Sequence, residues 1–110
     1  MYVVDLNKYK EDLDFWFKLE VEDLLGDIDI KLLEVSKSDI KNIIQRFIDI
    51  LTRYLNESNI KFKLENDKII IDYYDKTYIE GLIDDAFWTA LRDYAEEFLY
   101  EKYNIVIGVD

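Results

Sequence analysis

The chain has 110 residues, half of them hydrophobic and 15% aromatic, so residues 1–110 are sufficient to bury the core of a single domain. It contains no cysteine and no histidine, which excludes disulfides, thiolate chemistry and the Ser-His or Cys-His arrangements of nucleophilic enzymes. Asp and Glu number 25 against 14 Lys and Arg, a formal net charge of −11, and such a surface repels nucleic acid and anionic membranes.

The sequence contains no segment typical of a signal peptide or a membrane span. The N-terminus lacks a basic start followed by a sustained apolar run, and no stretch approaches the roughly 20 apolar residues that a span needs. We therefore expect a cytoplasmic protein.

The N-terminal third is compatible with two interpretations. Strict alternation of apolar residues is typical of a strand, and it is seen at Leu13, Phe15, Phe17, Leu19 and Val21. One side of a helix would instead collect Tyr9, Leu13, Trp16, Phe17, Val21, Leu24 and Leu25. Because a helix leaves Phe15 and Leu19 off that side, we favour a strand over 13–21, after a short helical turn at 5–11. A turn at Gly26-Asp27 and a second strand near 28–35 should follow.

The next segment predicts a long amphipathic helix. Apolar residues recur at helical spacing from Ile40 to Leu55. Ser36 with Asp39 resembles a capping box, and the 56–59 stretch, rich in Asn and Ser, should end the helix. The opposite side carries Lys41, Arg46 and Arg53, and an Asp49–Arg53 pair is expected there.

A hairpin and a second long helix complete the chain. The alternating residues of 60–64, a turn at Asn66-Asp67 and the β-branched run 69–71 predict the hairpin. An apolar stripe from Ile79 to Phe98 predicts the helix, with Thr77 and Glu80 as its capping box. Trp88 is expected at the rim of the core, and the apolar run 105–109 is expected to form a last strand.

These elements predict an α+β domain in which two long amphipathic helices cover one face of an antiparallel sheet, in the approximate order ββα-ββα-β. An internal repeat is a second hypothesis. The tetrapeptide Phe-Lys-Leu-Glu occurs at 17–20 and again at 62–65, and each copy would precede a second strand and a long helix.

Carboxylates are the abundant reactive groups. Closely spaced pairs occur at Asp12 and Asp14, at Asp27 and Asp29, and at Asp84 and Asp85. None has the spacing of an EF-hand loop, and so many acids generate such pairs by chance. We therefore expect no catalytic residue, no metal and no cofactor.

Two surfaces are candidates for binding a partner. In the strand interpretation, one outward face of 12–22 places same-side neighbours about 6.6 Å apart, close to the spacing of successive phosphates. Its candidate contacts are Asp12, Asp14, Trp16, Glu20 and Glu22. The second surface is the outward side of the C-terminal helix, where Tyr100 is a plausible anchor among carboxylates. Its candidate contacts are Asp85, Asp93, Glu96, Glu97 and Tyr100.

The charge favours a non-catalytic inhibitor that occupies the basic nucleic-acid-binding surface of a partner protein, as a DNA mimic does. In size and composition the chain is similar to phage anti-restriction and anti-CRISPR proteins, although no stretch matches a family motif. The alternatives are an immunity protein or antitoxin that neutralises a cationic toxin or nuclease, a structural or adaptor domain, and, last, a carboxylate enzyme. The expected partner is a basic protein that handles nucleic acid, with no direct contact to nucleic acid or membrane.

Overall fold

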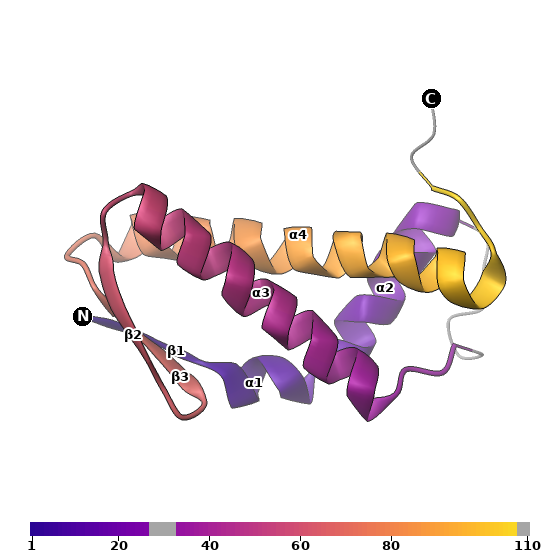
Figure 1. The fold of residues 1–110 in the computed structure, drawn as a ribbon, viewed down its shortest axis with the longest axis horizontal. Helices are drawn as coiled ribbons and strands as arrows, with labels where there is room; N and C mark the ends of the chain where they lie inside the picture. Colours follow the sequence, from indigo (N-terminus) through magenta and orange to yellow (C-terminus); the bar gives the residue numbers. More distant parts are fainter. Residues whose placement is uncertain (27–32, 108–110) are drawn as a thin grey trace.

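The computed structural model describes residues 1–26 and 33–107 (Figure 1). In chain order the elements of these ranges are β1 (Tyr2–Asp5), α1 (Leu6–Glu11), α2 (Leu13–Leu25), α3 (Lys37–Glu57), β2 (Lys61–Glu65), β3 (Lys68–Asp72) and α4 (Lys76–Tyr103). The predicted α+β class, an antiparallel sheet with two long helices, is confirmed. The predicted helical turn at 5–11 is also present, as α1.

The sheet has the strand order β1-β3-β2, and both pairs are antiparallel. The predicted hairpin is confirmed, and Asn66 in its turn has a left-handed φ of 57°. β1 was not predicted, because its four residues are too short to display a period. Val4 lies opposite Ile69, and both are buried in the core together with Ile71.

The two long helices span the molecule, with the sheet at one end and α2 at the other (Figure 1). A helix of 28 residues is about 42 Å long at ~1.5 Å per residue, which matches the longest dimension of 42 Å. α3 begins at the predicted capping box of Ser36 and Asp39. α4 begins earlier than predicted, because Asp75 rather than Thr77 caps it by accepting a hydrogen bond from the Tyr78 N–H.

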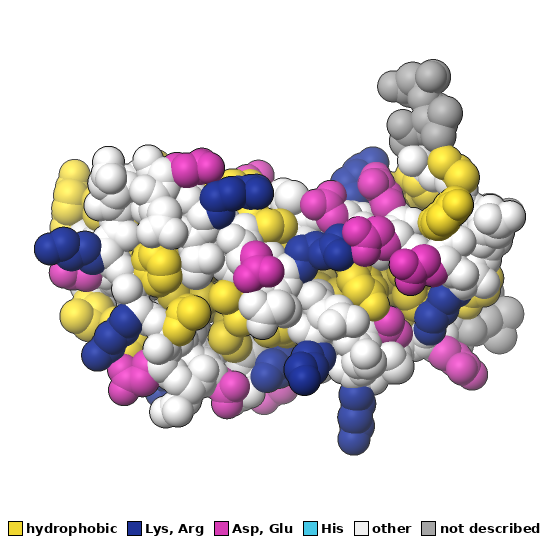
Figure 2. All heavy atoms as spheres, viewed as in Figure 1, with side chains coloured by type: hydrophobic (Ala, Val, Ile, Leu, Met, Phe, Trp, Pro, Cys, Tyr) yellow, Lys and Arg dark blue, Asp and Glu magenta, His cyan; other side chains and the backbone are white. Residues whose placement is uncertain are grey.

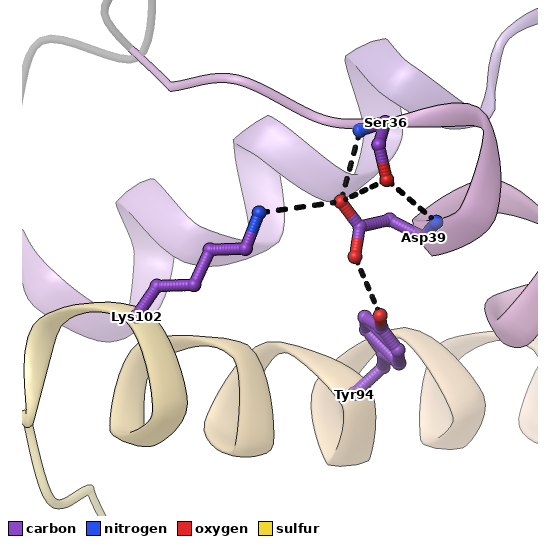
Figure 3. A network of polar contacts seen from close by, with 4 residues as sticks. All are labelled: Ser36, Asp39, Tyr94 and Lys102. Carbon is purple, nitrogen blue, oxygen red and sulfur yellow. Dashed lines mark hydrogen bonds and ion pairs between the residues drawn. The ribbon is translucent and has the colours of Figure 1, made fainter.

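A buried carboxylate joins the two helices (Figure 3). Asp39 is 6% exposed, and its Oδ1 accepts a 2.6 Å hydrogen bond from the Tyr94 hydroxyl. Its Oδ2 accepts from the Ser36 N–H and hydroxyl and lies 3.7 Å from the Lys102 ammonium. With every oxygen paired, this buried charge is compensated, and the network fixes the N-terminus of α3 against α4.

The predicted strand over 13–21 is wrong, because these residues form helix α2. Leu13, Phe17 and Val21 follow one another at successive helical turns, and all three are fully buried. The Phe17 ring packs edge-on against Phe98 of α4, with their centroids 5.1 Å apart. Phe15 does lie off the buried side, as the helix interpretation required. The segment is helical nonetheless, and the Phe15 side chain is 55% exposed.

The repeated tetrapeptide adopts two different structures. Residues 17–20 are helical in α2, and the identical residues 62–65 form most of β2. Packing partners therefore decide the backbone here, as they commonly do over weak local propensity. The ββα duplication is not supported, and the N-terminal third contributes a strand and two helices instead.

The two other expected strands are not formed by the residues that the structure describes. Of the strand near 28–35, positions 28–32 lie outside the described residues, and 33–35 are not in a strand. Of the strand at 105–109, positions 108 and 109 lie outside them, and 105–107 have no strand pairing. Asn104 instead ends α4 with a left-handed φ of 56°. None of the described helices combines the length and apolarity needed to cross a membrane.

Candidate functional site: an acidic surface around two tryptophans

The helical structure of α2 rearranges the first set of candidate residues. The row of carboxylates expected along a strand does not exist, because a helix turns alternate residues to different sides. Asp12, Trp16 and Glu20 are spaced four apart and share one side. Asp14 lies on another side, where its carboxylate is 3.3 Å from the Lys18 ammonium.

Trp16 of α2 meets Trp88 of α4, and these are the two tryptophans of the chain. Their ring centroids are 5.7 Å apart, and the ring planes are nearly perpendicular at 89°. Phe15 packs edge-on against Trp16 at 5.4 Å. We call these three residues the tryptophan patch. Trp16 is 37% and Trp88 42% exposed, so both indoles are available to a partner as well as to each other.

Two hollows share Trp88, which lines both of them. The first, of about 300 Å³, is lined by Trp16 and by the carboxylates of Asp12 and Asp84. The second, of about 530 Å³, lies beside the C-terminal end of α2. Its carboxylates are those of Glu20, Glu22 and Asp23. Trp88 is thus the aromatic side chain that the two acidic hollows have in common.

Each hollow also has a basic residue nearby. Lys8 lines the first hollow, beside its two carboxylates. Near the second, burial raises the pKa of Glu20, and the positive charge of Arg92 partly offsets this. With two carboxylates against one ammonium in the first hollow, and three against one guanidinium at the second, both remain negative.

The second set of candidate residues forms an acidic surface on the C-terminal half of α4. Figure 2 shows acidic side chains gathered over this part of the molecule, with basic side chains among them. Glu97 accepts a 2.7 Å hydrogen bond from the Arg46 guanidinium of α3, and this interaction raises the pKa of Arg46. Glu96 lies 3.7 Å from Arg92. This surface is therefore more neutralised than its sequence indicates.

Tyr100 and Asp85 occupy different parts of α4. Tyr100 is 57% exposed and lines a hollow of about 250 Å³ with Glu96, Glu97 and the segment 105–107. Asp85 lies away from them, near the Tyr54 hydroxyl, whose pKa is raised by a hydrogen bond to that carboxylate. Asp84, its neighbour in sequence, lines the first tryptophan hollow instead, so the two form no paired site.

Two residues that line the hollows, Asp23 and Asp84, were not among the candidate contacts. Trp88 was expected at the core rim, and it does pack on the buried Phe87 while it stays 42% exposed, but its contact with Trp16 was not predicted. The helical interpretation of residues 13–25 contained the signal for this site. It places Trp16 on the same side as Tyr9 and Leu13, and this side faces the rest of the protein. The structure brings Asp12, Trp16, Glu20 and Glu22 together around Trp88 and leaves Asp14 out.

Within the described residues, no group of three or more Asp or Glu side chains is close enough to hold a metal ion, and the pair Asp27 and Asp29 lies outside them. Comparison of the chain with protein families, with curated proteins and with solved structures finds no match.

Proposed function

We propose that this protein is a non-catalytic inhibitor that binds a basic protein and thereby occupies the surface with which that protein holds nucleic acid. The observation that carries the proposal is the pair of exposed tryptophans, Trp16 and Trp88, which line hollows together with five carboxylates, those of Asp12, Glu20, Glu22, Asp23 and Asp84. Tryptophan is the residue type most enriched where protein interfaces concentrate their binding energy.

The negative charge of this protein indicates that its partner is positively charged. The chain carries a net charge of −11, which attracts a basic surface over about a Debye length and accelerates association. A protein groove built for DNA or RNA is lined with Lys and Arg, so it offers the complementary charge. Carboxylates supply this attraction, and the indoles supply the apolar contact that holds the complex once it has formed.

The acidic surface of α4 is a secondary contact in this proposal. Arg92 connects it to the second hollow, because it pairs with Glu96 and also lies near Glu20. Its carboxylates contribute to long-range attraction even where they are paired, since the surface stays negative overall. The close contact is assigned to the patch, where two exposed indoles lie beside carboxylates.

The proposal is tested by capture from a nuclease-treated lysate of the source organism. We expect a basic nucleic-acid-binding protein to be retained at low salt, released as salt rises, and displaced by added duplex DNA or RNA. The variant Glu22→Lys with Asp84→Lys should lose the partner. The control Glu57→Lys with Asp72→Lys makes the same change in net charge at exposed positions of other elements, and it should retain most of the binding.

Partners that are not basic, or that remain bound when nucleic acid is added, would contradict the proposal. The identity of a displaced partner also separates the two classes of inhibitor. A nuclease of a defence system indicates an anti-restriction or anti-CRISPR role, and a toxin encoded beside this chain indicates an immunity protein or antitoxin.

A further inference from the structure

We infer that the two hollows beside Trp88 receive two arginine side chains from one basic segment of the partner, one in each hollow. This inference rests on the proposed function and specifies how its central contact is made. It follows from the ring geometry, from the distribution of carboxylates and from the size of the hollows.

The edge-to-face contact leaves aromatic surface free for a cation. In such a pair the rings overlap less than in a stacked pair. Trp16 and Trp88 meet in this way, and Phe15 and Phe87 pack edge-to-face with them in turn, yet both indoles stay more than a third exposed. Indole is the strongest of the aromatic side chains at attracting a cation to its face.

Both hollows are lined by carboxylates as well as by the Trp88 indole, so a guanidinium in either hollow has acceptors for its N–H groups. Asp12 and Asp84 line the first hollow, and Glu20 and Glu22 line the second. A carboxylate beside an aromatic face suits arginine better than lysine, because the planar guanidinium stacks on the ring and still directs several N–H groups outward. The first hollow, of about 300 Å³, is at the small end of ligand sites, and the second, of about 530 Å³, is in the lower half of their range, so each has room for one guanidinium.

The chain's own cations act as competitors. Lys8 lines the first hollow, and Arg92 lies near Glu20 at the second. Neither has an aromatic contact with the patch among the described residues; Arg92 pairs with Glu96 at 3.7 Å. An incoming arginine that both stacks and pairs therefore gains an interaction that these side chains do not make. Lys8→Ala should accordingly strengthen binding at the first hollow.

Intrinsic fluorescence tests the inference directly, because both tryptophans of the chain belong to the patch. The probes are short Ala/Ser peptides that carry two arginines at stepped spacings, and matched peptides with two lysines or two citrullines. We expect the arginine peptides to change the emission and to bind about three- to tenfold more tightly than the lysine peptides. One spacing should be preferred, since two sites at a fixed separation are bridged best by a matched linker.

Variants show whether the effect arises in the hollows. Trp88→Leu and Glu22→Gln should each weaken arginine binding about fivefold or more, whereas Glu57→Gln, an exposed carboxylate at the end of α3, should not change it. Circular dichroism and thermal melts check that each variant is folded. Equal affinity for arginine and lysine peptides, unchanged emission, or unchanged binding by Trp88→Leu would overturn the inference.

The two proposals fail in different ways. If a basic partner is captured and displaced by nucleic acid, but Trp88→Leu captures it equally well, the arginine sites are wrong and the proposed function stands. If the arginine peptides bind as described, but no captured protein competes with nucleic acid, the sites stand and the proposed function is wrong.

Discussion

Tyr94 in α4 donates a 2.6 Å hydrogen bond from its hydroxyl to Oδ1 of Asp39 in the first turn of α3. The two residues are 55 positions apart in sequence, so the bond is a long-range connection between the two long helices. Because Asp39 is also the acidic partner in the capping box of α3, one carboxylate both begins a helix and positions it.

Tyr94→Phe should lower the free energy of unfolding by about 1–3 kcal/mol, because it removes a hydrogen bond to a buried charge and leaves one oxygen without its donor. Urea denaturation at neutral pH measures this change. Tyr100→Phe is the matched control, since that tyrosine is 57% exposed. Equal stability of the two variants would contradict the role of the Tyr94–Asp39 bond.

Asp39 should make stability depend on pH. Burial alone raises the pKa of Asp39, but hydrogen bonds from Tyr94 and Ser36 and the charge of Lys102 outweigh it and hold the pKa below the ordinary 3.8. The unfolded chain therefore binds the proton more readily, and this stabilisation is present above the ordinary pKa and lost as pH falls through the folded one. The native protein and Asp39→Asn should differ in free energy of unfolding at neutral pH. This difference should shrink as the pH falls below the ordinary pKa of an aspartate side chain. A difference that stays constant would contradict the lowered pKa.

Phe17→Ala should destabilise the protein by about 3–5 kcal/mol, because the ring is fully buried between α2 and α4. Phe15→Ala should cost much less, since Phe15 is 55% exposed. Chemical denaturation of both variants tests the helical structure of α2. A strand would place both rings on the same side, so similar losses for the two would contradict the helix.

Arg46 and Glu97 should show a modest coupling. A double-mutant cycle with Arg46→Ala and Glu97→Ala is expected to give at most about 1 kcal/mol, because Glu97 is half exposed to water. The coupling should fall as salt is added. A coupling of zero at low salt would show that the 2.7 Å contact does not contribute to stability. A substitution that removes the charge of Glu97 therefore lowers the stability of the protein slightly and also changes its surface charge.

The long helices could be predicted because their apolar residues keep a helical period over several turns, and the hairpin could be predicted because its turn residues are distinctive. The stripe that includes Phe47 and Leu51, the Ser36–Asp39 cap and the Asn66 turn are local signals, and each is confirmed. The α2 segment was not predicted correctly, because its hydrophobic residues follow a period of two, whereas a period of 3.6 leaves Phe15 and Leu19 off the apolar side. Only the position of α4, to which Phe17 packs, decides between them.

The candidate site was predictable in its chemistry and not in its geometry. The excess of acids indicates a negative surface, but sequence does not show which carboxylates are neutralised by residues distant in the chain, as Glu97 is by Arg46. It also does not show that Trp16 and Trp88, which are 72 positions apart, touch each other. Contacts between helices depend on their packing, and the apolar sides alone do not fix it.

The central claim is that carboxylates around the tryptophan patch attract a basic partner and that the indoles hold it. The most direct measurement is the kinetics of binding to the captured partner at low and high salt, for the native protein, for Glu22→Gln with Asp84→Asn, and for Trp88→Leu. The charge variant should associate several-fold more slowly with a weaker salt dependence, and Trp88→Leu should mainly dissociate faster. Association and dissociation rates that are unchanged in both variants, with intact circular dichroism, would contradict the account and direct attention to Glu96, Glu97 and Tyr100 on α4.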